Sequence, residues 1–184
     1  MTTAREFAAP AIATLHDGSH DFDFLHGRWN VHHRRLSHPL SGSCERYEFN
    51  GTAVERPLWD GQANIEELDA ELPECRLHGL ALRLYCPLSR RWAIHWSTAE
   101  NGTLDQPMMI GDFRNGYGEF YNQETFEDRG IFVRFLWTSL TREKCRWEQA
   151  YSADGGMTWE TNWIMTFTRM ARRRRSFNLP LRRQ

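Results

Sequence analysis

The stretch Trp147–Arg169, WEQAYSADGGMTWETNWIMTFTR, decides the fold class of this chain. Its second half alternates large apolar residues with mostly polar ones, which is the period of a strand that buries one face. The turn sequence Asp154-Gly155-Gly156 stands before that half, so the whole stretch predicts a β-hairpin. The apolar positions of the second strand are Trp159, Trp163, Met165 and Phe167.

Outward from this hairpin, the chain repeats the same pattern of short strand-like runs between turn residues. No stretch shows a long 3.6-residue periodicity. About ten antiparallel strands in a meander predict an all-β, closed up-and-down barrel, because closure removes unpaired strand edges. A β-sandwich is the alternative architecture. The predicted strands cover residues 27–36, 44–53, 57–67, 76–86, 91–98, 107–114, 117–126, 130–140, 144–152 and 158–169.

Length and composition favour a single domain. A chain of 184 residues is long enough for one sizeable core. Aromatic residues make up 13% of it and include eight Trp, which indicates aromatic-rich strands or a ring-lined cavity. We expect a flexible N-terminal lead-in over residues 1–20, a barrel domain over 21–170 and an arginine-rich tail over 171–184.

Charge is unevenly distributed along the chain. The formal net charge is −1, but residues 171–184 hold six of the 23 basic residues and no acid. The remaining chain therefore carries 17 basic and 24 acidic side chains, a net charge of −7. A mildly acidic body is unlike a nucleic-acid-binding surface, so no nucleic-acid partner is predicted. The same body could attract the tail, which disfavours a nucleic-acid or membrane arm.

Targeting and metal-binding signals are weak. The N-terminus lacks a basic segment followed by a long apolar one, and no apolar run reaches about 18 residues, so neither a signal peptide nor a membrane span is predicted. The four cysteines show no CxxC spacing, which favours reduced thiols in the cytoplasm. His16 and His20 stand four residues apart in a segment with Gly and Ser, and no metal site is predicted.

Two hairpin registers define the predicted interior. Pairing Ser152 with Trp159 in the last hairpin, and Thr141 with Lys144 in the one before it, places Glu148 on the inward face both times. A carboxylate among Trp rings should have a raised pKa through desolvation unless a donor pairs with it. Glu148 is therefore a candidate acid, base or ligand anchor. The predicted inward face is Val133, Phe135, Trp137, Glu148, Trp163, Met165 and Phe167.

Two of these assignments have structural alternatives. Glu148 could instead pair with Arg146, or bind backbone amides, without a chemical role. His33 shares parity with Trp29 and Val31, so it is predicted to point inward. It is either a hydrogen-bonded core histidine or a catalytic group.

Strands 76–86 and 91–98 supply further candidates. In strand 91–98, Trp96 belongs to the aromatic face that we expect inside. In strand 76–86 the leucine face is predicted inside, and a polar cavity wall built from Arg83 and Tyr85 is the alternative. The leucines concerned are Leu80, Leu82 and Leu84.

The segment Ser152–Trp159, SADGGMTW, matches the Asp-box pattern Ser-x-Asp-x-Gly-x-Thr-Trp. The resemblance implies a structural turn, in which Asp154 and the hydroxyls bind backbone amides. Sialidases repeat this motif through a six-bladed propeller. The motif occurs once here, in a chain far too short for a propeller, which disfavours a sialidase.

A second motif, His26-Gly27-Arg28-Trp29, opens the first strand. It resembles the Gly-x-Trp start of lipocalins and related calycins. In those barrels the Trp closes the base, and an Arg near the end of the last strand packs over its ring in a cation–π contact. The resemblance implies these structural roles for Trp29 and Arg169.

Taken together, FDFLHGRWNVHHRRL, LRLYCPLSRRWAIHW and RWEQAYSADGGMTWETNWIMTFTR resemble a widespread bacterial family of calycin-like, or lipocalin-like, barrels of unknown function. The resemblance covers roughly residues 21–170. It implies a ten-stranded calycin-like fold with a cavity, but no reaction.

The leading functional hypothesis is a soluble barrel that binds a small hydrophobic or aromatic molecule in a Trp-lined cavity. Its ligand-binding residues would be Trp96, Trp137, Trp163, Tyr121, Arg83 and Arg146, with Glu148 fixing orientation.

An enzyme is the alternative, such as an isomerase, cyclase or decarboxylase. Glu148 would be its general acid or base, and Arg83 or His33 would stabilise charge. A third possibility is a barrel filled by side chains that acts as a scaffold or homodimer. No cofactor is predicted, although haem bound through His33 or His78 is a minor option.

Overall fold

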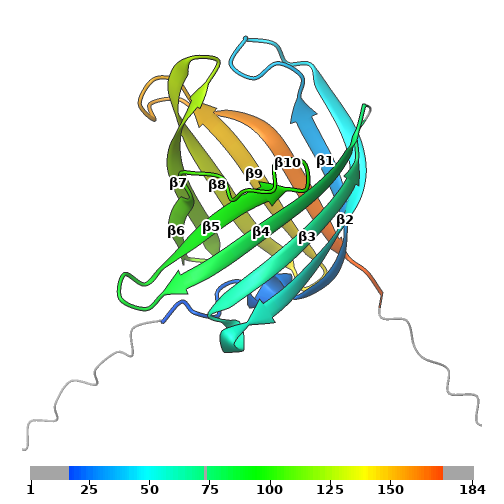
Figure 1. Cartoon of the computed structure of the whole chain (residues 1–184), viewed down its shortest axis with the longest axis vertical. Coiled ribbons are helices and arrows are strands. Elements are labelled where there is room, and N and C mark those ends of the chain that lie inside the picture. Colours follow the sequence, from blue (N-terminus) through cyan, green and yellow to red (C-terminus); the bar gives the residue numbers. More distant parts are fainter. Residues whose placement is uncertain (1–16, 73, 172–184) are drawn as a thin grey trace, which may run out of the picture.

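The computed structural model describes residues 17–72 and 74–171, which form one closed barrel of ten antiparallel strands (Figure 1). Each strand pairs with its neighbours in the chain, and β1 pairs with β10 to close the barrel. The all-β, up-and-down prediction is confirmed, and the sandwich alternative is wrong. The strands are β1 (Gly27–Leu36), β2 (Arg46–Leu58), β3 (Ala63–Glu71), β4 (Arg76–Cys86), β5 (Arg91–Thr98), β6 (Met109–Arg114), β7 (Tyr117–Phe126), β8 (Arg129–Thr141), β9 (Lys144–Ser152) and β10 (Glu160–Arg169).

The two predicted terminal segments fall mostly outside the described residues, which exclude 1–16 and 172–184. Within the described ranges, no helix is long and apolar enough to cross a membrane.

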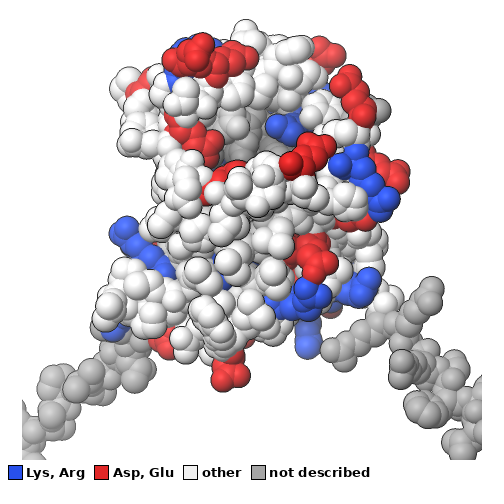
Figure 2. Space-filling view, viewed as in Figure 1, with Lys and Arg blue, Asp and Glu red and all other residues white. Residues whose placement is uncertain are grey.

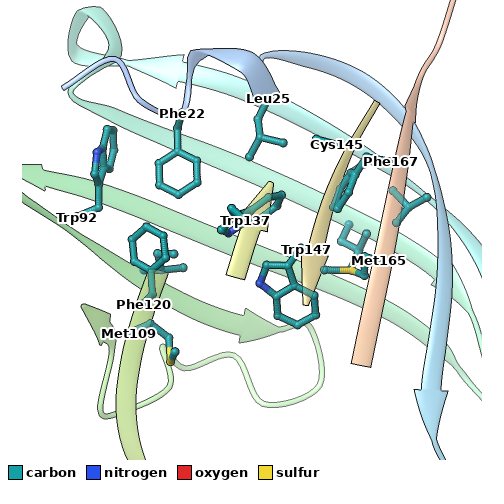
Figure 3. Close-up of a cluster of buried hydrophobic side chains, with 14 of the residues drawn as sticks. Phe22, Leu25, Trp92, Met109, Phe120, Trp137, Cys145, Trp147, Met165 and Phe167 are labelled. Carbon is teal, nitrogen blue, oxygen red and sulfur yellow. The ribbon is translucent and has the colours of Figure 1, made fainter. Parts of the chain in front are cut away.

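The N-terminal segment closes the lower end of the barrel in Figure 1. It contains the short 3-10 helix η1 (Asp23–Leu25), and the side chains of Phe22 and Leu25 are buried inside the barrel (Figure 3). Phe22 packs edge to face against Trp92 and Trp137, with ring centroids 5.0 and 6.0 Å apart. Burying a ring of this size contributes about 1.5–3 kcal/mol. The barrel therefore has one end closed by its own chain.

The contact expected from the calycin resemblance is present at this closed end. The guanidinium carbon of Arg169 lies 4.1 Å from the centre of the Trp29 ring. Arg169 also donates hydrogen bonds to the backbone oxygens of His26 (2.6 Å) and Phe24 (2.7 Å). The Trp29 indole donates to the Leu25 oxygen at 2.6 Å. One arginine thus links the last strand to residues 22–26, which close this end of the barrel and are called the plug below.

The β9–β10 turn has the hydrogen bonds expected of an Asp-box. Asp154 accepts hydrogen bonds from the Thr158 hydroxyl (2.6 Å), the Thr158 amide (2.9 Å) and the Ser152 hydroxyl (2.7 Å). Ser152 in turn accepts from the Gly156 amide. The Thr158 hydroxyl, followed by its amide, lowers the pKa of Asp154 to about 2. These contacts give Asp154 the structural position expected for it.

Two register shifts exchange the inward and outward faces of β9 relative to the prediction. Thr141 pairs with Lys144 as expected, but the β8–β9 register shifts by one residue just before that turn pair. The β9–β10 register shifts by one residue just before Trp163. Because side chains alternate between faces, Trp147 now faces inward and Glu148 outward. The predicted inward position of Glu148 is therefore wrong. The inward residues of β8 and β10 are as predicted: Val133, Phe135, Trp137, Trp163, Met165 and Phe167.

Strand β4 has the opposite orientation to the one expected from its leucines. Its buried positions are Gly79, Ala81 and Arg83, whereas the leucines between them are only half-buried. The prediction of an inward leucine face is wrong, and the alternative with Arg83 inside is correct. The outward residues are Leu80, Leu82 and Leu84.

The largest differences in strand boundaries lie on either side of the β2–β3 turn, where β3 begins at Ala63 and not at the predicted residue 57. The other difference concerns β2. It continues through Pro57, whereas the prediction ended this strand at residue 53. The chain turns instead at η2 (Trp59–Gly61), where Trp59 and Asp60 both have left-handed backbone conformations, with φ of 49° and 53°. Glu55, which the prediction left between two strands, lies within β2 and is buried.

Candidate functional site

A cavity of about 290 Å³ lies inside the barrel, between the plug and the opposite end. This volume is near the lower end of the range for small-molecule sites, so it suits a compact molecule of one or two rings. Six aromatic side chains line the cavity: Trp96, Phe135, Trp137, Trp147, Tyr151 and Trp163.

Contacts among these rings hold the wall together. Trp147 packs edge to face on Phe135 and on Trp163, with centroids 4.8 and 5.6 Å apart. On the other side, the Trp96 ring lies directly over Gly79, where a Cβ would come within 2.1 Å of the ring. Glycine at this position therefore makes room for Trp96 against the wall. The predicted positions of Trp96, Trp137 and Trp163 in a cavity wall agree with the structure.

A buried charged cluster forms the deep end of the cavity, next to the plug. Arg83 donates hydrogen bonds to Glu55 (2.9 Å), Asn64 (3.1 Å) and Glu66 (2.8 Å). The side chains of Arg83, Glu55 and Glu66 are only 2%, 1% and 3% exposed. Arg83 and Glu66 line the cavity, and the Arg83 guanidinium carbon lies 5.1 Å from the centre of the Phe22 ring. A fully buried charged cluster thus stands at the closed end of the cavity.

Strand register explains why these groups meet. Glu55 and Glu66 are directly opposite each other in the β2–β3 ladder. Two like charges in that arrangement repel each other, and the guanidinium between them compensates. Arg83 reaches them because it pairs with Asn64 in the β3–β4 ladder. Three consecutive strands therefore contribute to one cluster.

The cluster holds two carboxyl groups but one guanidinium, and this imbalance shifts the pKa values of Glu55 and Arg83. Burial raises the pKa of Glu55 to about 8, with Arg83 opposing the shift and the Glu66 carboxylate adding to it. Burial acts to lower the pKa of Arg83, but the Glu66 and Glu55 carboxylates outweigh it and the pKa is raised. Near neutral pH, Glu55 is therefore mostly protonated beside an Arg83–Glu66 ion pair.

Charged and amide side chains surround the other end of the cavity. Arg35 lies over the Trp163 ring at 4.5 Å from its centre, and Asp105 and Glu124 also line the cavity. Asn122 ties this rim to the β5–β6 loop through a 2.9 Å hydrogen bond from its amide to the oxygen of Pro107. Figure 2 shows a hollow in the upper part of the molecule with acidic side chains around it.

His33 is buried inside the barrel, as its parity predicted, but it does not line the cavity. Its ring stacks on Phe49 with centroids 4.3 Å apart, and its Nδ1 accepts a hydrogen bond from the Trp163 indole at 3.2 Å. Burial lowers the pKa of His33 to about 4. A neutral histidine held between two rings fits the core alternative better than the catalytic one.

Several predicted site residues lie on the outer face of the barrel instead. Glu148 and Arg146 form an ion pair there at 2.7 Å, with side chains 24% and 39% exposed. Tyr121 is 41% exposed and packs against Trp159 at a centroid distance of 6.0 Å. His78, the second haem candidate, is exposed on β4. The predicted cavity positions of Glu148, Arg146 and Tyr121 are therefore wrong.

The sequence interpretation missed Glu55, Glu66 and Trp147. A signal for Glu66 exists, because it shares parity with Leu68 and Ala70, the apolar positions of its strand that are buried. Trp147 was missed through the register shifts, and Glu55 through the misplaced turn after β2.

No protein-family model and no curated protein matches the chain. Among solved structures, the S-type phycobiliprotein lyase CPES from Guillardia theta is similar at 11% identity, over 82% of this chain and 91% of that one, with a TM-score of 0.53. The structure of EF1p2_mFAP2b bound to DFHBI has 12% identity over 83% of this chain and 99% of that one, and a TM-score of 0.45. A redesigned β-barrel, b11L5F_LGL, has 10% identity over 86% of this chain and 100% of that one, also with a TM-score of 0.45. At these identities the likeness concerns the barrel fold alone.

Proposed function

We propose that this protein binds a compact aromatic or hydrophobic molecule inside its barrel. The observation that carries the proposal is the cavity of about 290 Å³ with six aromatic side chains on its wall and a buried polar cluster at its deep end. Apolar walls with a few fixed polar groups are the usual composition of small-molecule sites.

We propose the cytoplasm as the location of the protein. Its four cysteines are free and three of them are exposed, which suits a reducing compartment.

A cavity-filling variant tests the proposed ligand binding. Ala81 faces the cavity beside Trp96, so Ala81→Phe should fill part of the space. Leu82→Phe places the same ring on the outer face of β4 and is the matched control. One- and two-ring aromatic molecules, titrated against tryptophan fluorescence, should bind the wild type and Leu82→Phe but not Ala81→Phe. Binding that is equal in all three proteins would contradict a site in the barrel.

An enzyme is the second candidate, because the Glu66 side chain faces the cavity and stands directly opposite a second buried carboxyl group, Glu55. Such a pair could serve as a general acid or base. Glu66→Gln would separate the two functions: an enzyme would retain ligand binding and lose conversion. If the wild type converts none of its ligands and Glu66→Gln only binds them more weakly, the protein is a binding protein.

We also propose that the chain is related to the calycin-like bacterial barrels and that it forms a homodimer. The contact of the Arg169 guanidinium with the Trp29 ring supports the first of these two proposals. The second is supported by the half-buried leucines on the outer face of β4, which are Leu80, Leu82 and Leu84.

A further inference from the structure

The charged cluster at the deep end of the cavity has an unbalanced composition. Arg83 uses its Nη1 on Glu55 and its Nη2 on Glu66, so one guanidinium serves two facing carboxyl groups. The second oxygen of Glu55, Oε1, is buried and has no hydrogen-bond partner. If both carboxyl groups were ionised, the cluster would carry one uncompensated negative charge. Burying such a charge is costly, so the cluster is complete only with a proton or with a second cation.

The other groups that face the cluster do not supply this second cation. Cys145 on β9 packs nearby, and burial raises the pKa of its thiol to about 12, so it stays neutral. Arg169 on β10 is held by the oxygens of Phe24 and His26 at the closed end. Asn64 on β3 is uncharged. The proton on Glu55 is thus the group that balances the charge when no other cation is present.

The remainder of the cavity also favours a positive charge. Besides Glu66, two further acids line it, Asp105 and Glu124, whereas the basic side chain at that end, Arg35, lies over the Trp163 ring. Indole rings attract cations through their faces, and four Trp side chains stand on the wall. An anion would meet the carboxylates of Glu66, Asp105 and Glu124, and the two Nη atoms of Arg83 are already bonded to Glu55 and Glu66.

From this arrangement we propose that the ligand is a small aromatic or hydrophobic cation, such as a protonated amine, which pairs with Glu66 and displaces the proton of Glu55. This inference rests on the proposed function and names its ligand class. The charge on Glu66 is then matched by the ligand, which leaves Arg83 to compensate an ionised Glu55. One cation enters and one proton leaves, so the net charge of the cluster does not change.

Three probes of matched shape test the proposal: 2-naphthylmethylamine as the cation, 2-naphthylmethanol as the neutral molecule and 2-naphthoate as the anion. Isothermal titration calorimetry at pH 7 should show the amine binding about tenfold tighter than the alcohol, and the anion weakest. Measured in two buffers of different ionisation enthalpy, amine binding should release close to one proton. The alcohol should release none.

Two conservative variants locate the effect. Glu55→Gln should still bind the amine but release no proton, and Glu66→Gln should lose the preference for amine over alcohol. The selectivity of the wild type needs no variant, so a variant that fails to fold leaves the proposal testable.

The outcomes separate this inference from the proposed function. Equal binding of all three probes, abolished by Ala81→Phe, would overturn the cation and leave the cavity site standing. Amine binding that survives Ala81→Phe would overturn the cation site in the barrel. No binding of any probe to the wild type would count against both proposals.

Discussion

Replacing Glu55 with glutamine should remove a pH dependence of stability that the buried cluster creates. Glu55 has a pKa of about 8 in the folded protein, raised by burial from its ordinary value of 4.5. Between these values the folded protein binds a proton at this site that the unfolded chain does not bind. Raising the pH through this window therefore favours unfolding.

The magnitude follows from the width of the usable window. Below pH 6.5, His33 acts in the opposite direction, because burial lowers its pKa from 6.5 to about 4 and protonation then favours the unfolded chain. From pH 6.5 to 8 the opposing contribution of His33 is small, about 0.4 kcal/mol, and that of Glu55 dominates. At about 1.4 kcal/mol per pH unit, declining near pH 8, the Glu55 site should cost the wild type about 1.5 kcal/mol of unfolding free energy across this range.

Urea denaturation followed by tryptophan fluorescence at pH 6.5 and pH 8 measures this loss. Glutamine resembles the protonated carboxyl group in shape, so Glu55→Gln should gain about 1.5 kcal/mol relative to the wild type between the two pH values. The matched control is Glu71→Gln, an exposed glutamate at the end of β3, which should not gain in this way. A wild type whose stability is flat or rising over this range would refute the reasoning, as would a variant that keeps the slope.

Three further substitutions test the contacts at the closed end of the barrel and in the β9–β10 turn. Arg169→Ala should lower the unfolding free energy by about 2–4 kcal/mol in urea, since it removes three charged hydrogen bonds and the contact with Trp29. Arg169→Lys should recover less than half of this loss. Phe22→Ala should cost about 3–5 kcal/mol by removing a fully buried ring of the plug, and the half-buried Phe24→Ala clearly less; equal losses would argue against the plug packing. Asp154 contributes stability that is present above its ordinary pKa of 3.8 and lost as the pH falls towards about 2, so acid unfolding of Asp154→Asn should lack this dependence, and an unchanged acid profile would contradict it.

The barrel was predictable because its evidence is local and repeated. Strand alternation and turn residues recur along the whole chain, so an error in one strand does not alter the architecture. The contact of Arg169 with Trp29 followed from the motif that opens the first strand and from residue parity in the last strand, which meet at the closed end of the barrel. The hydrogen bonds of Asp154 followed from a turn whose geometry depends on a few neighbouring residues.

The face of β9 was not predictable in the same way. A one-residue register shift reverses every side chain beyond it, and neither shift is marked by a glycine or proline. The two shifts lie on opposite sides of β9, so each moves this strand relative to a neighbour whose own face is assigned correctly. Trp147 and Glu148 exchanged faces, while Trp137 and Trp163 kept theirs. Register errors therefore removed the predicted acid from the cavity without disturbing its aromatic wall.

The inversion of β4 has a different origin and bears on function. Hydrophobicity alone assigns its leucines to the interior, and in a barrel filled with apolar side chains that assignment would hold. Here the interior must accommodate Arg83, because two carboxyl groups face each other on β2 and β3 and need a guanidinium between them. A fold that only needed stability would be served as well by apolar residues at all three positions. The local conflict between hydrophobic pattern and orientation therefore supports the proposal that this cluster belongs to a binding site.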